Sequence, residues 1–311
     1  MVLAVSTGLA MILELLCFSN ASANPPATEF QVNTFVNGNN YNPAVAIDAE
    51  GDFVITWFSD QYGFPNGSIY AQMYNRDGAP KGIEFQVNTI TDDAQYRPAI
   101  AIAGDGSFVV VWKSYSVLWE LADIYGPDYL SGIYAQRYDI NGTPQGNRFL
   151  IDHYTSGVDL AAAITPSGNL IVVWNDVPGN IYARIYADNG EAVGEKPKVC
   201  SDGNTGLDVA AGSEGNFVVT FRKGNDIYVR MYDSAGNPLG NEFEANQFGY
   251  AGERCDPAVA VGGGWDGNRC SHDASGRGNA GLMQPSIRDR AGRAHLRDVV
   301  IQAHDSGPPS A

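Results

Sequence analysis

The residues best suited to chemistry gather in one long connection between two strand-like runs, from Trp112 to Ile133. This connection holds four aromatic side chains beside three acids, and the aromatic residues are Tyr115, Trp119, Tyr125 and Tyr129. Long loops on rigid scaffolds often bind ligands, and aromatic rings can stack on a sugar or a protein partner. We predict a binding surface for a carbohydrate or protein ligand at these four residues. The alternative interpretation is a lid that packs on the neighbouring unit.

No catalytic set follows from the remaining reactive residue types. Of the 4 histidines only His153 precedes residue 262, so a histidine triad or a histidine-rich metal site is hard to build from the main part of the chain. The repeated acids Asp52, Asp77, Asp105 and Asp139 stand beside turn glycines, which favours turn roles over paired-carboxylate catalysis. No run matches a calcium-loop pattern, so calcium has no support in the sequence. We therefore predict no catalytic residue, no metal site and no cofactor.

Two arginines are the other candidate for ligand recognition. Arg184 and Arg230 occupy the strand position where earlier repeats have Gln72 and Gln136. Arginines clustered in this way could bind an acidic sugar. A recurring strand position more simply indicates packing between neighbouring units, and we favour that interpretation.

An internal repeat must position all of these residues. Its clearest piece occurs four times, as SIYAQMYNRDG at Ser68, GIYAQRYDING at Gly132, NIYARIYADNG at Asn180 and DIYVRMYDSAG at Asp226. A second piece ends in a large aromatic residue, namely Trp57, Trp112, Trp174 and Phe221. A third begins at Pro43, Pro98, Leu160, Leu207 and Pro257, and a fourth, EFQVNT or its variants, begins at Glu29, Glu84, Arg148, Lys196 and Glu242. The aromatic residues recur roughly 45 to 60 residues apart, which is typical of propeller blades.

Each repeat therefore predicts four short antiparallel strands joined by tight turns with glycine. Alternation in IYAQMY places Ile69, Ala71 and Met73 on one face of a strand. Because a sheet that is apolar on both faces needs a cover on each, we predict an all-β protein of radially stacked sheets, a β-propeller of four to five blades that can be incomplete. The alternative is an elongated stack of β-repeats.

The run from EFQVNT at Glu29 to the second EFQVNT at Glu84, through NPAVAIDAEGDFVITW, resembles a repeat of large exported or surface-associated bacterial proteins. That resemblance implies a propeller-type module outside the cytoplasm with a binding or structural role. It implies no catalytic residues, because the recurring motif contains none. We expect a non-enzymatic adhesion or interaction module; the alternative is a carbohydrate-active propeller enzyme, either a glycoside hydrolase or a polysaccharide lyase.

The two ends of the sequence differ from the repeat region, residues 24–261. Residues 1–23 are apolar and end in Ala-Ser-Ala, which resembles a signal peptide and predicts a secreted or cell-surface protein. Glu14 interrupts this run, so we predict no membrane span. After Val261 the pattern stops. We interpret residues 262–311 as an irregular tail produced by a shifted reading frame; the alternative is a genuine C-terminal extension. The net charge of −16 argues against nucleic-acid binding.

Overall fold

The computed structural model describes residues 29–61, 67–89, 94–115, 131–153, 159–202, 206–245, 255–261, 272–273, 282–283 and 299–305. Contacts divide the chain into a first unit, Met1–Thr34, and a second unit, Phe35–Ala311. In the first unit, residues 29–34 form no strand, so the strand expected from EFQVNT at Glu29 is not formed there. All strands described below belong to the second unit.

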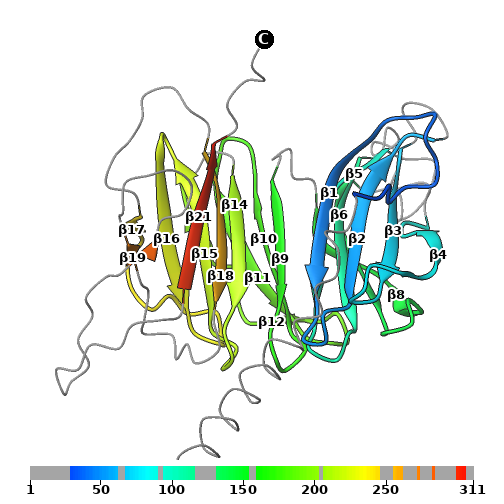
Figure 1. Cartoon of the computed structure of the whole chain (residues 1–311). Coiled ribbons are helices and arrows are strands. Elements are labelled where there is room, and N and C mark those ends of the chain that lie inside the picture. Colours follow the sequence, from blue (N-terminus) through cyan, green and yellow to red (C-terminus); the bar gives the residue numbers. More distant parts are fainter. Residues whose placement is uncertain are drawn as a thin grey trace, which may run out of the picture. The chain divides into compact units, whose positions relative to one another are not determined.

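Four antiparallel sheets follow the repeats in chain order, and we call them blades 1 to 4 (Figure 1). Blade 1 contains β1 (Asn40–Ile47), β2 (Phe53–Ser59), β3 (Ser68–Tyr74) and β4 (Pro80–Gln86). Blade 2 contains β5 (Ala94–Ile102), β6 (Phe108–Tyr115), β7 (Gly132–Tyr138) and β8 (Pro144–His153). Blade 3 contains β9 (Leu160–Ile164), β10 (Leu170–Asn175), β11 (Ile181–Tyr186), β12 (Ala192–Val193) and β13 (Lys198–Cys200). Blade 4 contains β14 (Leu207–Ala211), β15 (Phe217–Lys223), β16 (Asp226–Tyr232) and β17 (Phe243–Glu244).

The outer edge of blade 3 departs from the common plan. Its fourth strand is divided into β12 and β13, and both pair with β11. The sequence already differs here, because KPKVC at Lys196 is the most altered copy of the fourth piece.

A fifth, smaller sheet follows blade 4. It pairs β18 (Cys255–Val261) with β21 (Val299–Asp305). A separate two-stranded sheet pairs β19 (His272–Asp273) with β20 (Leu282–Met283). The last three of these strands come from the segment interpreted as a tail, so part of that segment forms strands.

Turn glycines behave as the sequence predicts. Gly106 and Gly142 have φ of 84° and 78°, a left-handed backbone conformation that favours glycine. The Gly142 N–H donates to the Asp139 carbonyl over 3.0 Å, while Asp139 Oδ1 accepts the backbone N–H of Thr143 over 2.8 Å. The hydrogen bonds that the carboxylate accepts from the backbone N–H groups of Thr143 and Asn141 hold the pKa of Asp139 below its usual value. Asp139 thus closes its turn, as expected.

In blades 2, 3 and 4, the large aromatic residue near the end of the second strand lies between neighbouring blades. Trp112, Trp174 and Phe221 are each fully buried. Trp112 belongs to the apolar cluster shared by blades 1 and 2, Trp174 to that of blades 2 and 3, and Phe221 to that of blades 3 and 4. The cores of the molecule therefore lie between the sheets, where they bury apolar surface of both partners.

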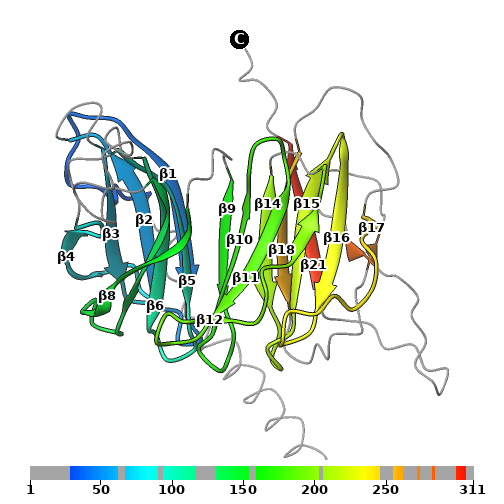
Figure 2. The ribbon, with the colours of Figure 1, turned by 180° about the vertical axis from the view of Figure 1, so that it is seen from behind.

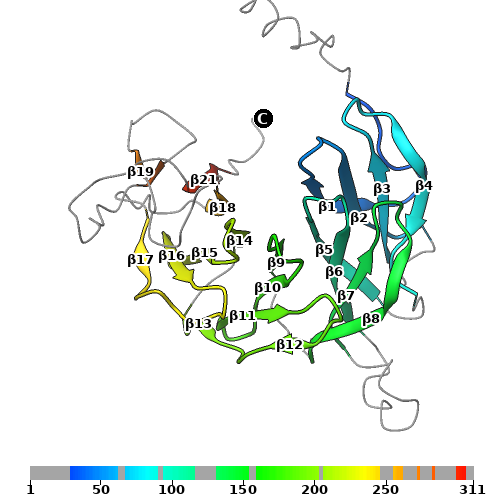
Figure 3. The same ribbon diagram turned by 90° about the horizontal axis from the view of Figure 1, so that it is seen from below.

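The first strands of the blades lie next to one another. β1 contacts β5, β5 contacts β9, β9 contacts β14, and β14 contacts β18. In the view from below, each blade runs outward from its first strand, and the view from behind shows the same order (Figures 2 and 3). This arrangement confirms the predicted all-β propeller architecture. Across the described ranges, no helix is long and apolar enough to cross a membrane.

Candidate functional site

The predicted binding loop is described only at its first residue. Tyr115 is the last residue of β6, and its side chain is 42% exposed. Trp119, Tyr125 and Tyr129 lie outside the described residues. The binding surface on this loop therefore stays a prediction.

The two arginines of the repeated strand position occupy equivalent places, as expected. Arg184 pairs with Val172 in blade 3, and Arg230 pairs with Val219 in blade 4. Arg230 Nη1 donates to the Val199 carbonyl of blade 3 over 2.6 Å. Arg230 thus links blade 4 to the outer strand of blade 3, which supports the packing interpretation.

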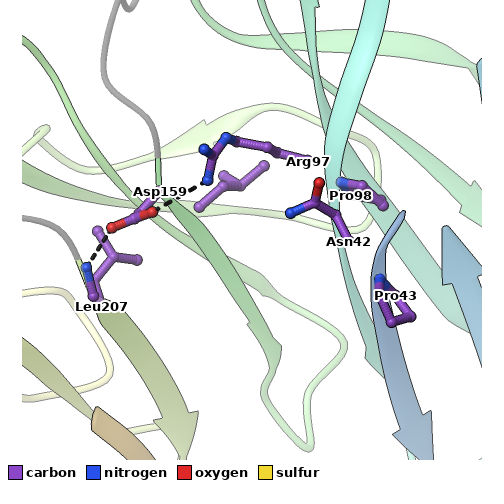
Figure 4. Close-up of a pocket in the computed structure, with 8 residues that line it drawn as sticks. Asn42, Pro43, Arg97, Pro98, Asp159 and Leu207 are labelled. Atoms are coloured by element: carbon purple, nitrogen blue, oxygen red, sulfur yellow. Dashed lines mark hydrogen bonds and ion pairs between the residues drawn. The ribbon is translucent and has the colours of Figure 1, made fainter. Parts of the chain in front are cut away.

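A cleft of about 240 Å³ opens where the first strands of the four blades begin (Figure 4). Each blade contributes one pair of consecutive residues at the same place in the repeat. The lining residues are Asn42, Pro43, Arg97, Pro98, Asp159, Leu160, Gly206 and Leu207.

The register places this cleft at the same end of the blades as the long connection. In blade 1, Asn40 at the start of β1 pairs with Ser59 at the end of β2. In blade 2, Ala94 at the start of β5 pairs with Tyr115, from which the long connection leaves. We call this the cleft end of the blades.

Backbone irregularities in β1 and β5 form two sides of the cleft. The register shifts between Tyr41 and Ala44, and again between Tyr96 and Ala99. Inside these bulges Asn42 and Arg97 both have φ of 54°. A left-handed conformation is uncommon for residues other than glycine and costs roughly 1 to 3 kcal/mol. Such strain is concentrated at functional sites, which makes this end of the fold a candidate.

An ion pair spans the cleft from blade 2 to blade 3. Arg97 Nη1 lies 3.5 Å from Asp159 Oδ1, and Figure 4 shows the two side chains pointing toward each other. Asp159 Oδ2 also accepts the backbone N–H of Gly206 from blade 4. The backbone N–H of Asp159 donates to Asn175 Oδ1 over 2.8 Å, which fixes the start of β9. Asp159 therefore ties three blades together at the cleft.

A second cation lies behind the ion pair. Lys113 is only 3% exposed, and its partner in the register is Tyr96, the neighbour of Arg97. Burial lowers the pKa of Lys113 to about 8; repulsion by Arg97 adds to this effect, and attraction by Asp159 opposes it. Near neutral pH the three groups therefore combine two cations with one carboxylate.

This charge balance suits binding of an anionic, hydrogen-bonding ligand. Arginine binds carboxylates in a planar, two-pronged geometry, and a ligand carboxylate would also be attracted by Lys113. Among the described lining residues Asp159 is the one carboxylate, whereas glycoside hydrolysis generally uses a pair.

Sequence reasoning missed Arg97, Lys113 and Asp159. No local signal marks them, because the repeat position shared by Asn42, Arg97, Asp159 and Gly206 varies, and the positions beside it vary as well.

A second cleft, of about 330 Å³, lies at the outer strands of blades 3 and 4 and includes Cys200, Lys223, Arg230 and Glu242. Lys223 Nζ is 2.9 Å from Glu242 Oε1, and burial raises the pKa of the Cys200 thiol. These groups are thus paired or unreactive. In the part of the chain that is described, no group of three or more histidine, cysteine or acidic side chains could hold a metal ion.

No protein-family model and no curated protein matches the chain. Among solved structures, a Hadza microbial sialidase matches with a TM-score of 0.50 and 12% identity, over 87% of this chain and 57% of that chain. A Penicillium chrysogenum alpha-L-arabinanase complexed with arabinobiose matches with a TM-score of 0.43 and 16% identity, over 63% and 58% of the two chains. The fucose-specific lectin from Aleuria aurantia matches with a TM-score of 0.43 and 12% identity, over 73% and 68%.

Together with the stacked sheets, the match to the sialidase defines the chain as a β-propeller protein, and at 12% identity this likeness shows the fold alone. The chain spans 57% of the length of that sialidase. The fold by itself fits both the non-enzymatic module that the repeats predict first and the carbohydrate-active alternative.

Proposed function

We propose that this chain is a carbohydrate-binding propeller module that holds an acidic sugar in the cleft at Arg97. The observation that carries the proposal is the local charge. Arg97 in the cleft and the buried Lys113 near it outnumber Asp159, although the whole chain has a net charge of −16. In a strongly acidic protein, a small cationic site selects anionic groups that can reach it.

The surroundings of the ion pair fit a sugar ligand. The cleft is open to solvent on one side, and Arg97 is 40% exposed at its side chain, so a ligand carboxylate can approach its guanidinium. Tyr115 is exposed at the same end of the blades and offers an aromatic face for stacking on a sugar ring.

Calorimetric titration with acidic and neutral oligosaccharides of equal length tests the proposal. Oligogalacturonides should bind and neutral oligosaccharides should not. Arg97→Ala should weaken binding roughly 10- to 100-fold, because it removes a charge-assisted hydrogen bond. The matched control is Arg76→Ala, which removes the same charge from an exposed turn at the opposite end of blade 1. Equal loss in both variants would show that only net charge matters and would refute the cleft as the site.

Carbohydrate hydrolysis or lyase activity is the second candidate, favoured by the fold shared with a sialidase. Its assay is the release of reducing ends or unsaturated products from acidic polysaccharides. Because Asp159 is already held by Arg97 and by the Gly206 N–H, we expect no turnover. If the wild-type chain releases these products and Asp159→Asn abolishes the activity, the chain is an enzyme and the binding-module proposal is wrong.

Export to the cell surface or the medium belongs to the same proposal. Its support is the apolar start of the sequence, and its test is detection of the mature N-terminus in the medium or on cells.

A further inference from the structure

Two boundaries between sheets share one packing arrangement. At the first boundary, Ala44 and Ala46 of β1 pack with Ile100 and Ile102 of β5. After blade 4 the same arrangement returns, since Ala210 of β14 shares a cluster with Val259 and Val261 of β18. At these two boundaries, the first strand of one blade presents small residues, and the first strand that follows presents larger aliphatic residues to them.

Blade 1 presents this large aliphatic face to solvent. Val45 and Ile47 occupy the repeat positions of Ile100 and Ile102, but they are 65% and 64% exposed, whereas Ile100 is 7% exposed. We call Val45 and Ile47 the uncovered face of β1.

A face of small residues that could cover Val45 and Ile47 lies on β18. Val259 and Val261 pack on blade 4, and Asp208 Oδ2 accepts the Val259 N–H over 2.8 Å, so this strand is seated there. Because side chains alternate along a strand, Ala258 and Ala260 point to the other side. Ala260 is exposed. β18 therefore offers the small-residue face that large aliphatic residues cover at the first boundary.

We propose that a second copy of this chain docks on the uncovered face of β1 through its own β18. In this contact Val45 and Ile47 of one copy pack on Ala258 and Ala260 of the other, as Ile100 and Ile102 pack on Ala44 and Ala46 within the chain. A second copy is the fitting partner because one chain presents both halves of the boundary, at different places. The chain's own β18 leaves Val45 and Ile47 exposed. The contact is head-to-tail, with different surfaces on the two copies.

Sedimentation equilibrium of the full chain over a micromolar concentration series tests this contact. The wild-type chain should self-associate. Val45→Lys, which blocks the uncovered face, and Ala260→Lys, which blocks β18, should each weaken association roughly 10- to 100-fold, as loss of a central interface residue does. Both residues are exposed, so the variants should keep the wild-type circular dichroism spectrum. The matched control is Ile83→Lys, at an isoleucine of β4 that is 86% exposed, and it should associate like the wild type.

Mixing the two blocked variants gives the decisive result. The Val45→Lys chain keeps an intact β18, and the Ala260→Lys chain keeps an intact uncovered face, so the mixture should form a one-to-one complex that neither forms alone. A wild-type chain that stays monomeric throughout would overturn the proposal. So would unchanged association of the Val45→Lys chain, or a mixture that stays monomeric.

Discussion

Replacing Trp112 measures how strongly packing between blades stabilises this fold. Trp112 is fully buried between blades 1 and 2, and its indole N–H donates to Gln95 Oε1 over 2.8 Å. Truncating a buried tryptophan to alanine typically costs about 3 to 5 kcal/mol. Trp112→Phe keeps most of the apolar contact but removes the indole donor, so it should cost only about 1 to 2 kcal/mol. The fourth repeat has phenylalanine at this position, Phe221, so the fold accommodates that ring.

The assay is urea unfolding followed by far-ultraviolet circular dichroism, which does not depend on tryptophan fluorescence. With a denaturant slope of about 3 kcal/mol per molar urea, Trp112→Ala should lower the unfolding midpoint by about 1 to 1.7 M. Val177→Ala is the control, since this side chain is 66% exposed and its truncation should change stability by less than about 0.5 kcal/mol. A cost below about 1 kcal/mol for Trp112→Ala would refute the packing argument. Equal costs for the two Trp112 variants would show that the hydrogen bond outweighs the packing.

Three further changes test other parts of the structure. Folding lowers the pKa of Lys113 from 10.5 to about 8, so the unfolded chain binds this proton more tightly than the folded chain does. The free energy of unfolding, measured in urea, should therefore rise between pH 8 and pH 10.5. Lys113→Met should remove this rise. Gly142→Ala would place a methyl group 2.8 Å from Met73 Sδ, so it should cost more than Gly168→Ala, which has a similar φ and open space; equal melting temperatures would contradict the contact. Arg230→Met removes the hydrogen bond between blades 3 and 4 and should cost about 1 to 3 kcal/mol in the same unfolding assay, whereas no loss would mean that the bond contributes nothing.

The proposed ligand adds a pH dependence to these tests. Because Lys113 loses its charge as the pH rises through about 8, affinity for an acidic oligosaccharide should fall above that pH. The decline should be smaller in Lys113→Met, measured by the same calorimetric titration. An affinity that does not change across this range would remove Lys113 from the site.

Much of the fold could be predicted because its causes are local. The period of two in IYAQMY determines which of Ile69, Tyr70 and Ala71 share a face, and the structure places Ile69 and Ala71 in the core between blades 1 and 2. Glycines such as Gly106 form turns because a left-handed backbone costs them little. Repetition of these signals then predicts stacked blades without reference to distant contacts.

The candidate site depended on contacts that no local pattern reports. Local patterns predicted most of the strands, the turns and the aromatic residues between blades. The meeting of Arg97, Lys113 and Asp159 depends on the tertiary structure, because a bulge turns Arg97 into the cleft, sheet register places Lys113 behind it, and blade stacking brings Asp159 across. Val45 and Ile100 occupy the same repeat position, yet Val45 is exposed and Ile100 is buried. The difference arises because blade 1 covers Ile100, whereas no preceding blade among the described residues covers Val45. Neighbours across blades are far apart in the chain, so their effect on a residue becomes visible only after folding.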